Sequence, residues 1–273
     1  MKPCLSQVCS LSSPFEKDVE DYAAGQCFAI EAWFTKLENY LSAHSLASLK
    51  ELLEENSVSL PVASYQGGLL VSQGEQRQEA WKLFDRRLAL AKELRVETIV
   101  VACDAASPLS QATIERMQVS LVQLAQRAGL NGVRIALEFQ ATSAFGNNLQ
   151  TAAALVAEVA SPHLGICLDA MHFFTGPSKT EDLALLNSSN LFHVQFCDLA
   201  DIPRELATDS QRILPGDGDF PLPLIVDQLR RIGYEGYVSV ELMNPQIWQI
   251  SPRSFGEIAL TALRKVLGQA SMG

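Results

Sequence analysis

Four short apolar runs in the second half of the chain each lead to a side chain that can hold a metal ion or move a proton. These side chains are Glu138, Asp169, Gln195 and Glu241. Three carboxylates and one amide oxygen form a set of hard oxygen donors, which suits Mn²⁺, Mg²⁺ or Co²⁺ and also accommodates Zn²⁺. Carboxylates can in addition act as general acids and bases. Joint action of the four residues requires a fold that brings them together.

Alternation along the runs sends the four polar side chains to one side. Successive side chains of a β-strand point to opposite faces, and the outer face of a barrel must be apolar to meet its helices. The residues predicted to point outward are Val133, Ile135, Leu137, Ile166, Leu168, Phe192, Val194, Phe196, Val238 and Val240. The inward positions then fall on Glu138, Asp169, Gln195 and Glu241 at the strand ends, with His193 one layer below Gln195.

The spacing of the four residues fits one repeating unit of strand and helix. Glu138 and Asp169 are 31 residues apart, Asp169 and Gln195 are 26 apart, and Gln195 and Glu241 are 46 apart. A (β/α)8 barrel averages about 31 residues per unit. The third interval therefore contains one unit and an inserted loop, from Cys197 to about Pro221.

The elements needed to position the site alternate along the whole chain. Helical spacing of apolar residues predicts helices over 81–91, 114–124 and 255–266. Strands are predicted at Gln7–Leu11, Cys27–Trp33, Leu60–Tyr65, Thr98–Cys103, Val133–Glu138, Leu164–Asp169, Phe192–Phe196 and Tyr237–Glu241. Alternating strands and helices favour a parallel sheet, so we predict an α/β protein whose residues 1–273 form a single-domain (β/α)8 TIM barrel. A doubly wound open sheet is the alternative, but no glycine-rich phosphate turn follows the first strand.

Composition narrows the class of partner. The chain has 21 Lys and Arg against 31 Asp and Glu, a formal charge of −10, which disfavours nucleic acid as a partner. No apolar run approaches the ~20 residues that span a bilayer, and the first residues do not resemble a secretion signal. Six scattered cysteines without a C-x-x-C pair indicate reduced thiols and a cytoplasmic protein. A small-molecule substrate is therefore expected, and a homo-oligomer stays open.

Convergence of three carboxylates has an electrostatic cost. Like charges at one point repel each other unless a cation lies between them, and a divalent metal ion is one solution. The alternative is that each acid caps a neighbouring helix or pairs with an arginine at the rim. Four such residues at repeat spacing favour the metal site.

Taken together, the strand ends resemble the xylose isomerase-like TIM-barrel family. The segments that carry this resemblance are Ala136-Leu137-Glu138, Leu168-Asp169-Ala170-Met171-His172, His193-Val194-Gln195 and Ser239-Val240-Glu241. The family includes sugar and sugar-phosphate isomerases and epimerases, inosose and 3-dehydroshikimate dehydratases, and abasic-site endonucleases. The resemblance implies that Glu138, Asp169, Gln195 and Glu241 are the metal ligands. The third ligand is often His, and Gln at this position is similar to the 3-dehydroshikimate dehydratase-like branch.

The resemblance and the strand alternation add four candidate substrate-binding residues. His172 follows Asp169 by three residues, where the family places a substrate-binding histidine or, more rarely, a ligand of a second metal. Arg212 lies in the inserted loop and offers a planar fork for a carboxylate or phosphate, although that loop also reads as an ordinary turn. Trp33 is expected to wall the substrate or to fill the core. His193 is expected to support the site from below or to contact the substrate.

The chemistry that the resemblance implies is proton transfer beside a carbonyl group. A metal ion would act as a Lewis acid, with Glu138 and Glu241 as general base and acid around an enediolate. Isomerisation or epimerisation of a sugar-like polyhydroxy carbonyl compound is the first reading. Dehydration assisted by His172 is the close alternative. A DNA-repair nuclease and a non-catalytic binding barrel follow, disfavoured by the negative charge and by the four competent ligand positions.

Overall fold

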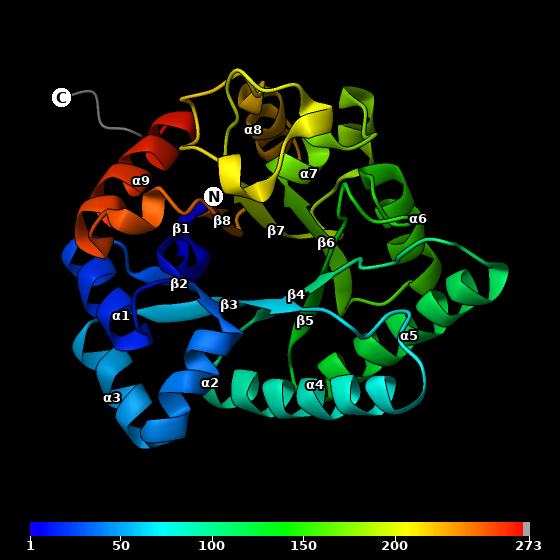
Figure 1. The fold of residues 1–273 in the computed structure, drawn as a ribbon, viewed down its shortest axis with the longest axis horizontal. Helices are drawn as coiled ribbons and strands as arrows, with labels where there is room; N and C mark the ends of the chain where they lie inside the picture. Colours follow the sequence, from blue (N-terminus) through cyan, green and yellow to red (C-terminus); the bar gives the residue numbers. More distant parts are fainter. Residues whose placement is uncertain (270–273) are drawn as a thin grey trace.

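Eight parallel strands close into a barrel in chain order, with β1 beside β8 (Figure 1). The computed structural model describes residues 1–269. The strands are β1 Lys2–Ser6, β2 Ala29–Trp33, β3 Ser59–Gln66, β4 Thr98–Ala102, β5 Arg134–Glu138, β6 Leu164–Asp169, β7 Leu191–Phe196 and β8 Tyr237–Val240. All neighbouring pairs are parallel.

Helices surround the barrel and cover its outer face (Figure 1). They are α1 Phe15–Ala24, α2 Phe34–Ala43, α3 Leu46–Glu55, α4 Gly74–Leu94, α5 Gln111–Leu130, α6 Leu149–Val159, α7 Ala170–Thr175, α8 Leu222–Arg231 and α9 Pro252–Val266. Local capping sets several starts: the side chains of Ser110, Asn148 and Ser251 each accept a hydrogen bond from the backbone N–H three residues on. None of the helices within residues 1–269 combines the length and hydrophobicity that crossing a membrane requires.

The prediction of a single-domain (β/α)8 TIM barrel is confirmed. Its stated bounds, 1–273, include four residues, 270–273, that lie outside the described part of the chain. The expected inserted loop is present, because no α-helix begins between the end of β7 and the start of α8 at Leu222.

The first strand lies earlier than predicted. Residues Lys2–Ser6 form β1, while Gln7–Ser10 form a short 3₁₀ helix. Leu5 pairs with Val240 of β8 and with Ile30 of β2, so both sides of β1 are paired with neighbouring strands before Gln7. The prediction over 7–11 was wrong because the buried stretch continues past the strand into the loop at the barrel mouth.

Phe192 points into the barrel, not outward as predicted. The register of β6 against β7 shifts between the pairs Ile166–Leu191 and Cys167–His193, which turns both Phe192 and His193 inward. The Phe192 ring packs over Gly165, where an added Cβ would lie 2.6 Å from Cγ of the ring. Strand alternation alone does not reveal such a bulge.

The interior of the barrel is apolar toward the amino ends of its strands and polar toward their carboxyl ends. The apolar cluster inside the barrel, which is separate from the outer core, consists of Val62, Val100, Ala136, Cys167 and Phe192. The outward residues Ile135, Leu137, Ile166 and Leu168 belong instead to the large core that includes the helices. Polar side chains therefore gather at the carboxyl ends of the strands, where TIM barrels hold their active sites.

Candidate active site

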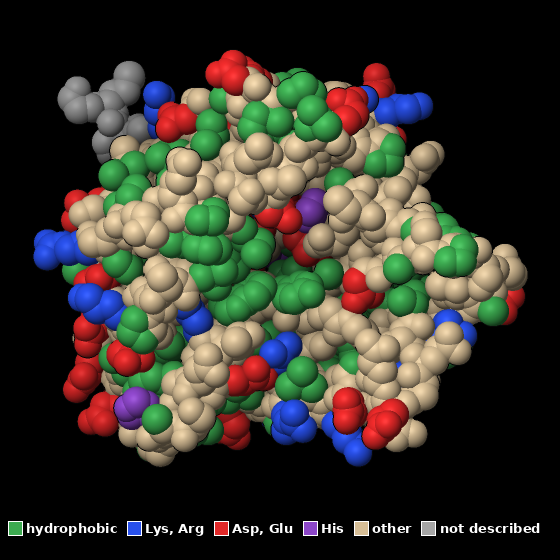
Figure 2. All heavy atoms as spheres, in the orientation of Figure 1, with side chains coloured by type: hydrophobic (Ala, Val, Ile, Leu, Met, Phe, Trp, Pro, Cys, Tyr) green, Lys and Arg blue, Asp and Glu red, His purple; other side chains and the backbone are tan. Residues whose placement is uncertain are grey.

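The structure brings the four predicted ligand residues together at the carboxyl ends of four strands. Glu138 ends β5, Asp169 ends β6, Gln195 lies in β7 and Glu241 directly follows β8. All four are buried. In Figure 2, acidic groups and a histidine lie in a hollow near the centre of the visible face, bordered by hydrophobic side chains.

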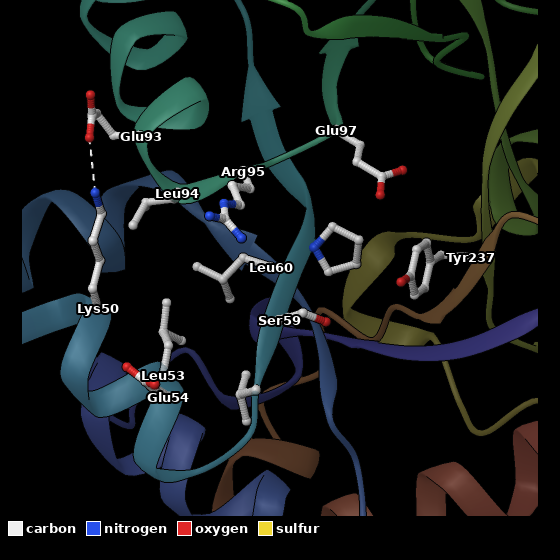
Figure 3. Close-up of a pocket in the computed structure, with 12 residues that line it drawn as sticks. Lys50, Leu53, Glu54, Ser59, Leu60, Glu93, Leu94, Arg95, Glu97 and Tyr237 are labelled. Atoms are coloured by element: carbon white, nitrogen blue, oxygen red, sulfur yellow. Dashed lines mark hydrogen bonds and ion pairs between the residues drawn. The ribbon is translucent and has the colours of Figure 1, made fainter.

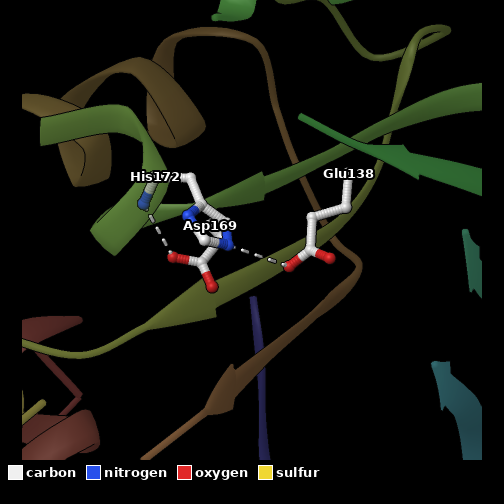
Figure 4. Close-up of side chains that lie close together, drawn as sticks. All are labelled: Glu138, Asp169 and His172. Carbon is white, nitrogen blue, oxygen red and sulfur yellow. Dashed lines mark hydrogen bonds and ion pairs between the residues drawn. The ribbon is translucent and has the colours of Figure 1, made fainter. Parts of the chain in front are cut away.

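One part of the site is a compact set of three donors. Ligand atoms of Glu138, Asp169 and His172 all lie within 4.8 Å of one another (Figure 4). His172 Nε2 lies 4.0 Å from Glu138 Oε1, while Glu138 Oε2 accepts a hydrogen bond of 2.5 Å from Gln140 Nε2. Two carboxylates and an imidazole are suitable ligands for a divalent cation.

Asp169 also determines where His172 lies. Its Oδ1 accepts a hydrogen bond of 3.2 Å from the backbone N–H of His172 and so caps the short helix α7. The alternative to a metal site is that each acid caps a neighbouring helix or pairs with an arginine at the rim, and Asp169 and Glu241 both pair with Arg212. Asp169 also caps helix α7, and this cap places His172 beside Glu138.

Arg212 is held between the carboxylates. Its Nη1 donates to Asp169 Oδ2 at 2.7 Å and to Glu241 Oε2 at 2.9 Å. Its Nε and Nη2 donate to Asp209 Oδ1 at 3.0 and 2.8 Å. Only 2% of Arg212 is exposed. The inserted loop is therefore more than a surface turn, since it places a buried cation in the centre of the acidic cluster.

Gln195 lies between two carboxylates. Its Nε2 donates to Glu31 Oε1 at 2.9 Å and to Glu241 Oε1 at 3.0 Å, while its Oε1 accepts from the Cys167 thiol at 3.0 Å. Below it, His193 Nε2 lies 3.0 Å from Glu31 Oε2. His193 is completely buried and contacts the second carboxylate oxygen of the same glutamate.

Burial and mutual repulsion shift the pKa values of the three acids by different amounts and in different directions. Burial raises the pKa of Glu138 well above its ordinary value, and the negative charge of Asp169 adds to the effect. Burial also raises the pKa of Glu241, against the opposing charge of Arg212. Asp169 differs: burial acts upward, but Arg212 and His172 outweigh it and lower its pKa to about 2. Asp169 is therefore the fixed anion of the cluster.

An aromatic pair stands at the ends of β2 and β3. The rings of Trp33 and Tyr65 are stacked, with centroids 5.5 Å apart and planes at 6°. Tyr65 is 45% exposed, and both rings are available as an apolar surface at the barrel mouth. The backbone N–H of Trp33 donates to Gln7 Oε1 at 3.0 Å, which fixes the end of β2.

The inserted loop is tied down by Asp198, which the sequence did not single out. Asp198 is fully buried and accepts hydrogen bonds from the backbone N–H groups of Gly216 and Phe220, both at 2.9 Å. Gly218 packs so closely that an added Cβ would lie 2.4 Å from the carbonyl oxygen of Leu199. These contacts fix the loop that carries Arg212.

Sequence reasoning missed two further partners of the site. Glu31 of β2 received no role from the sequence, although its carboxylate contacts His193 Nε2 and accepts a hydrogen bond from Gln195 Nε2. Asp209, which holds the guanidinium of Arg212, gave no signal, because its significance depends on the path of the loop.

A separate hollow of about 520 Å³ lies at the opposite end of the barrel (Figure 3). It is lined by the beginnings of β3 and β8, including Ser59 and Tyr237, and by Lys50, which bonds Glu93 at 2.9 Å. It contains none of the predicted site residues. In TIM barrels this end serves stability, so the hollow is not a candidate active site.

The fold and the rim chemistry define a class: a TIM barrel with buried carboxylates and a histidine at the carboxyl ends of its strands. The family model described as xylose isomerase-like TIM barrel matches residues 23–261. The chain belongs to this family, as its strand-end motifs predicted.

Two named relatives differ in coverage. The chain is 31% identical over 263 residues to an inosose isomerase of Halalkalibacterium halodurans, covering 92% of this chain and 91% of the relative. It is 26% identical over 242 residues to a 3-dehydroshikimate dehydratase of Pseudomonas aeruginosa, covering 86% of this chain but 37% of that protein. Both names denote enzymes, and the prediction that this chain is an enzyme is confirmed.

Solved structures agree on the fold. A crystal structure of the IolI protein with a zinc atom bound matches with a TM-score of 0.91, at 26% identity and 100% coverage of both chains. A D-psicose 3-epimerase structure matches with a TM-score of 0.78 at 21% identity, covering 98% of this chain and all of the other. The second match concerns the fold alone.

Proposed function

We propose that this chain, acting as one domain, is a divalent-metal-dependent isomerase or epimerase of a sugar-like polyhydroxy carbonyl compound. The observation that carries the proposal is the donor cluster of Glu138, Asp169 and His172 within 4.8 Å, buried at the barrel mouth. The match to an inosose isomerase over 92% of the chain supports the reaction class.

The residues that would hold the ion are Glu138, Asp169, Gln195 and Glu241, with His172 beside them. The zinc atom in the related IolI structure supports a divalent metal. The oxygen-rich donor set also suits Mn²⁺, Mg²⁺ and Co²⁺. A bound ion would supply Lewis-acid polarisation of vicinal substrate oxygens.

The protein's own side chains would move the proton. Glu138 and Glu241 lie on different strands around the centre, so one carboxylate can remove a proton from the carbon beside the carbonyl and the other can return it. Return to the neighbouring carbon of the enediolate gives isomerisation, and return to the opposite face gives epimerisation. Trp33 would present its ring to the substrate, while His172 and Arg212 would orient its oxygens. His193 would hold Glu31, which in turn holds Gln195.

Dehydration is the second candidate. It is supported by the 3-dehydroshikimate dehydratase relative and by Gln195, which resembles that branch of the family. The first proton transfer is the same in both reactions. The outcome then depends on whether an acid such as His172 protonates a departing β-hydroxyl group.

One experiment separates these functions. Inosose, 3-dehydroshikimate, D-fructose and D-psicose would be incubated with the enzyme and Zn²⁺, Mn²⁺, Mg²⁺ or Co²⁺ in D₂O. We expect exchange of the proton beside the carbonyl group of the true substrate, loss of that exchange in Glu138→Gln, and about one divalent ion bound per chain. Isomer formation supports the first function and loss of water the second. Absence of both metal binding and exchange would refute the proposal.

The compartment is part of the same proposal. All six cysteines are buried free thiols. This supports a protein that works in the reducing cytoplasm.

A further inference from the structure

Arg212 occupies an unusual place for an arginine in a proposed metal site. A single nitrogen, Nη1, lies 2.7 Å from Asp169 Oδ2 and 2.9 Å from Glu241 Oε2. These oxygens belong to two of the four proposed ligand residues. A bridging cation is therefore already present within the chain.

The remaining oxygens of the two acids are also engaged. Asp169 Oδ1 accepts the backbone N–H of His172, and Glu241 Oε1 accepts Nε2 of Gln195. Glu138 differs, because its Oε1 accepts no hydrogen bond from residues 1–269 and lies 4.0 Å from Nε2 of His172. An ion bound by Asp169 and Glu241 would thus face the guanidinium across the same carboxylates, where two cations repel each other.

The other side of the guanidinium is held from the protein surface. Asp209 Oδ1 accepts from both Nε and Nη2 of Arg212, and Asp209 is 48% exposed. The carbonyl oxygen of Arg212 accepts from Asn244 Nδ2 at 3.0 Å. The backbone is therefore fixed separately, and Asp209 is the exposed acid that holds the Nε and Nη2 side of the guanidinium.

From these contacts we propose that Arg212 is an internal counter-ion that competes with the divalent metal for Asp169 and Glu241. The proposal rests on the metal site of the proposed function and adds to it a control of metal affinity. Metal binding must displace or loosen the guanidinium, so the affinity of the wild type is lower than its ligands alone would give. Asp209 stabilises the arginine-bound state.

Two variants weaken the competitor in different ways. Arg212→Gln removes the charge but keeps a hydrogen-bonding group beside the carboxylates. Asp209→Asn leaves Arg212 in place and removes the charge that anchors it. Asp85→Asn is the matched control, since Asp85 is also an exposed acid (54%) paired with an arginine, Arg127 at 2.7 Å.

Zn²⁺ binding would be measured by calorimetry on the four proteins, with thermal unfolding at zero and saturating Zn²⁺. An arginine beside a carboxylate lowers the pKa of that carboxylate by about 1–3 units, so it weakens the binding of a proton about tenfold or more. We expect it to oppose Zn²⁺ in the same way, so that Zn²⁺ binds roughly tenfold or more tightly to Arg212→Gln. Asp209→Asn should bind severalfold more tightly, and Asp85→Asn like the wild type. The midpoint of thermal unfolding of Arg212→Gln should fall without Zn²⁺ and recover with it.

Each outcome decides the proposal. Unchanged or weaker Zn²⁺ binding in both Arg212→Gln and Asp209→Asn would refute the proposal that Arg212 competes with the metal. If the wild type still binds Zn²⁺ in that case, the metal site of the proposed function is retained. Zn²⁺ binding only after the arginine is weakened would support the competition and refute a metal-dependent wild type. Binding by none of the proteins would overturn both. Asp209→Asn decides alone if Arg212→Gln does not fold.

Discussion

Asp18 gives a prediction in which the free energy of unfolding tests how the end of β2 is held beside the active site. This carboxylate is fully buried and pairs with Lys36 Nζ at 2.5 Å. Its Oδ2 also accepts from Nε2 of Gln7, whose Oε1 in turn accepts the backbone N–H of Trp33. The buried pair thus supports the end of β2, where Trp33 stands.

The magnitude follows from the pKa of Asp18. Burial outweighs the attraction of Lys36 and raises the pKa of Asp18 from 3.8 to about 6. A shift of about two units corresponds to about 3 kcal/mol of folding free energy. Because the folded state holds this proton more tightly, the contribution is fully present below pH 3.8 and is lost as the pH rises through 6.

The assay compares the wild type with Asp18→Asn by urea unfolding between pH 4 and pH 7. The advantage of the wild type in free energy of unfolding should shrink by about 2 to 3 kcal/mol over this range, since the variant cannot titrate at this position. Asp85→Asn controls for the loss of one acidic residue. Lys36→Met should cost about 3–5 kcal/mol at pH 7, because it leaves the carboxylate without its counter-charge.

A difference between wild type and Asp18→Asn that stays flat or grows with pH would refute this reasoning. It would mean that the carboxylate is solvated or that Lys36 compensates its burial. In either case the burial of Asp18 would not make the pH-dependent contribution to stability worked out above.

Three further predictions concern the site and its loop. Gln195→His should keep divalent metal and Gln195→Leu should bind it more weakly, as calorimetry would measure; equal affinity of the Leu variant would remove Gln195 from the ligands. Trp33→Ala should raise KM by about tenfold, the effect of about 1.4 kcal/mol of lost ring contact, without changing metal affinity; an unchanged KM would assign the ring to packing. Gly218→Ala should destabilise the protein by about 1–3 kcal/mol in urea unfolding, because its Cβ would lie 2.4 Å from Leu199 O and 2.5 Å from Asp198 Oδ1; wild-type stability would show that the loop yields.

The strand ends could be predicted from the sequence because two strong constraints act on them. A closed parallel barrel places an apolar residue outward at every second position, so the polar residue at each strand end has only one face left. This reasoning positioned Glu138, Asp169, Gln195 and Glu241 at one rim. Their roles as ligands stay predictions.

Elsewhere the same reasoning failed for physical reasons. Phe192 turned inward because β7 carries a bulge, and period-two alternation contains no signal for an extra residue. The first strand lies at Lys2–Ser6 because pairing with β8, not local alternation, decides where it begins. The contact of Arg212 with Asp169 joins residues 43 positions apart through a loop, and no local pattern fixes the path of such a loop.

An amide at position 195 in place of an imidazole changes which hydrogen bonds the neighbouring carboxylates can accept. A neutral imidazole has one N–H donor and one acceptor, whereas an amide has two N–H donors on one nitrogen and a separate oxygen. That nitrogen can bind Glu31 and Glu241 together, and the oxygen then faces Cys167. For the oxygen to reach a metal ion, the amide must turn and leave at least one carboxylate without its donor. Metal binding at Gln195 is therefore coupled to Glu31, and Gln195→His should make the metal affinity insensitive to Glu31→Gln, whereas in the wild type the same change should alter it.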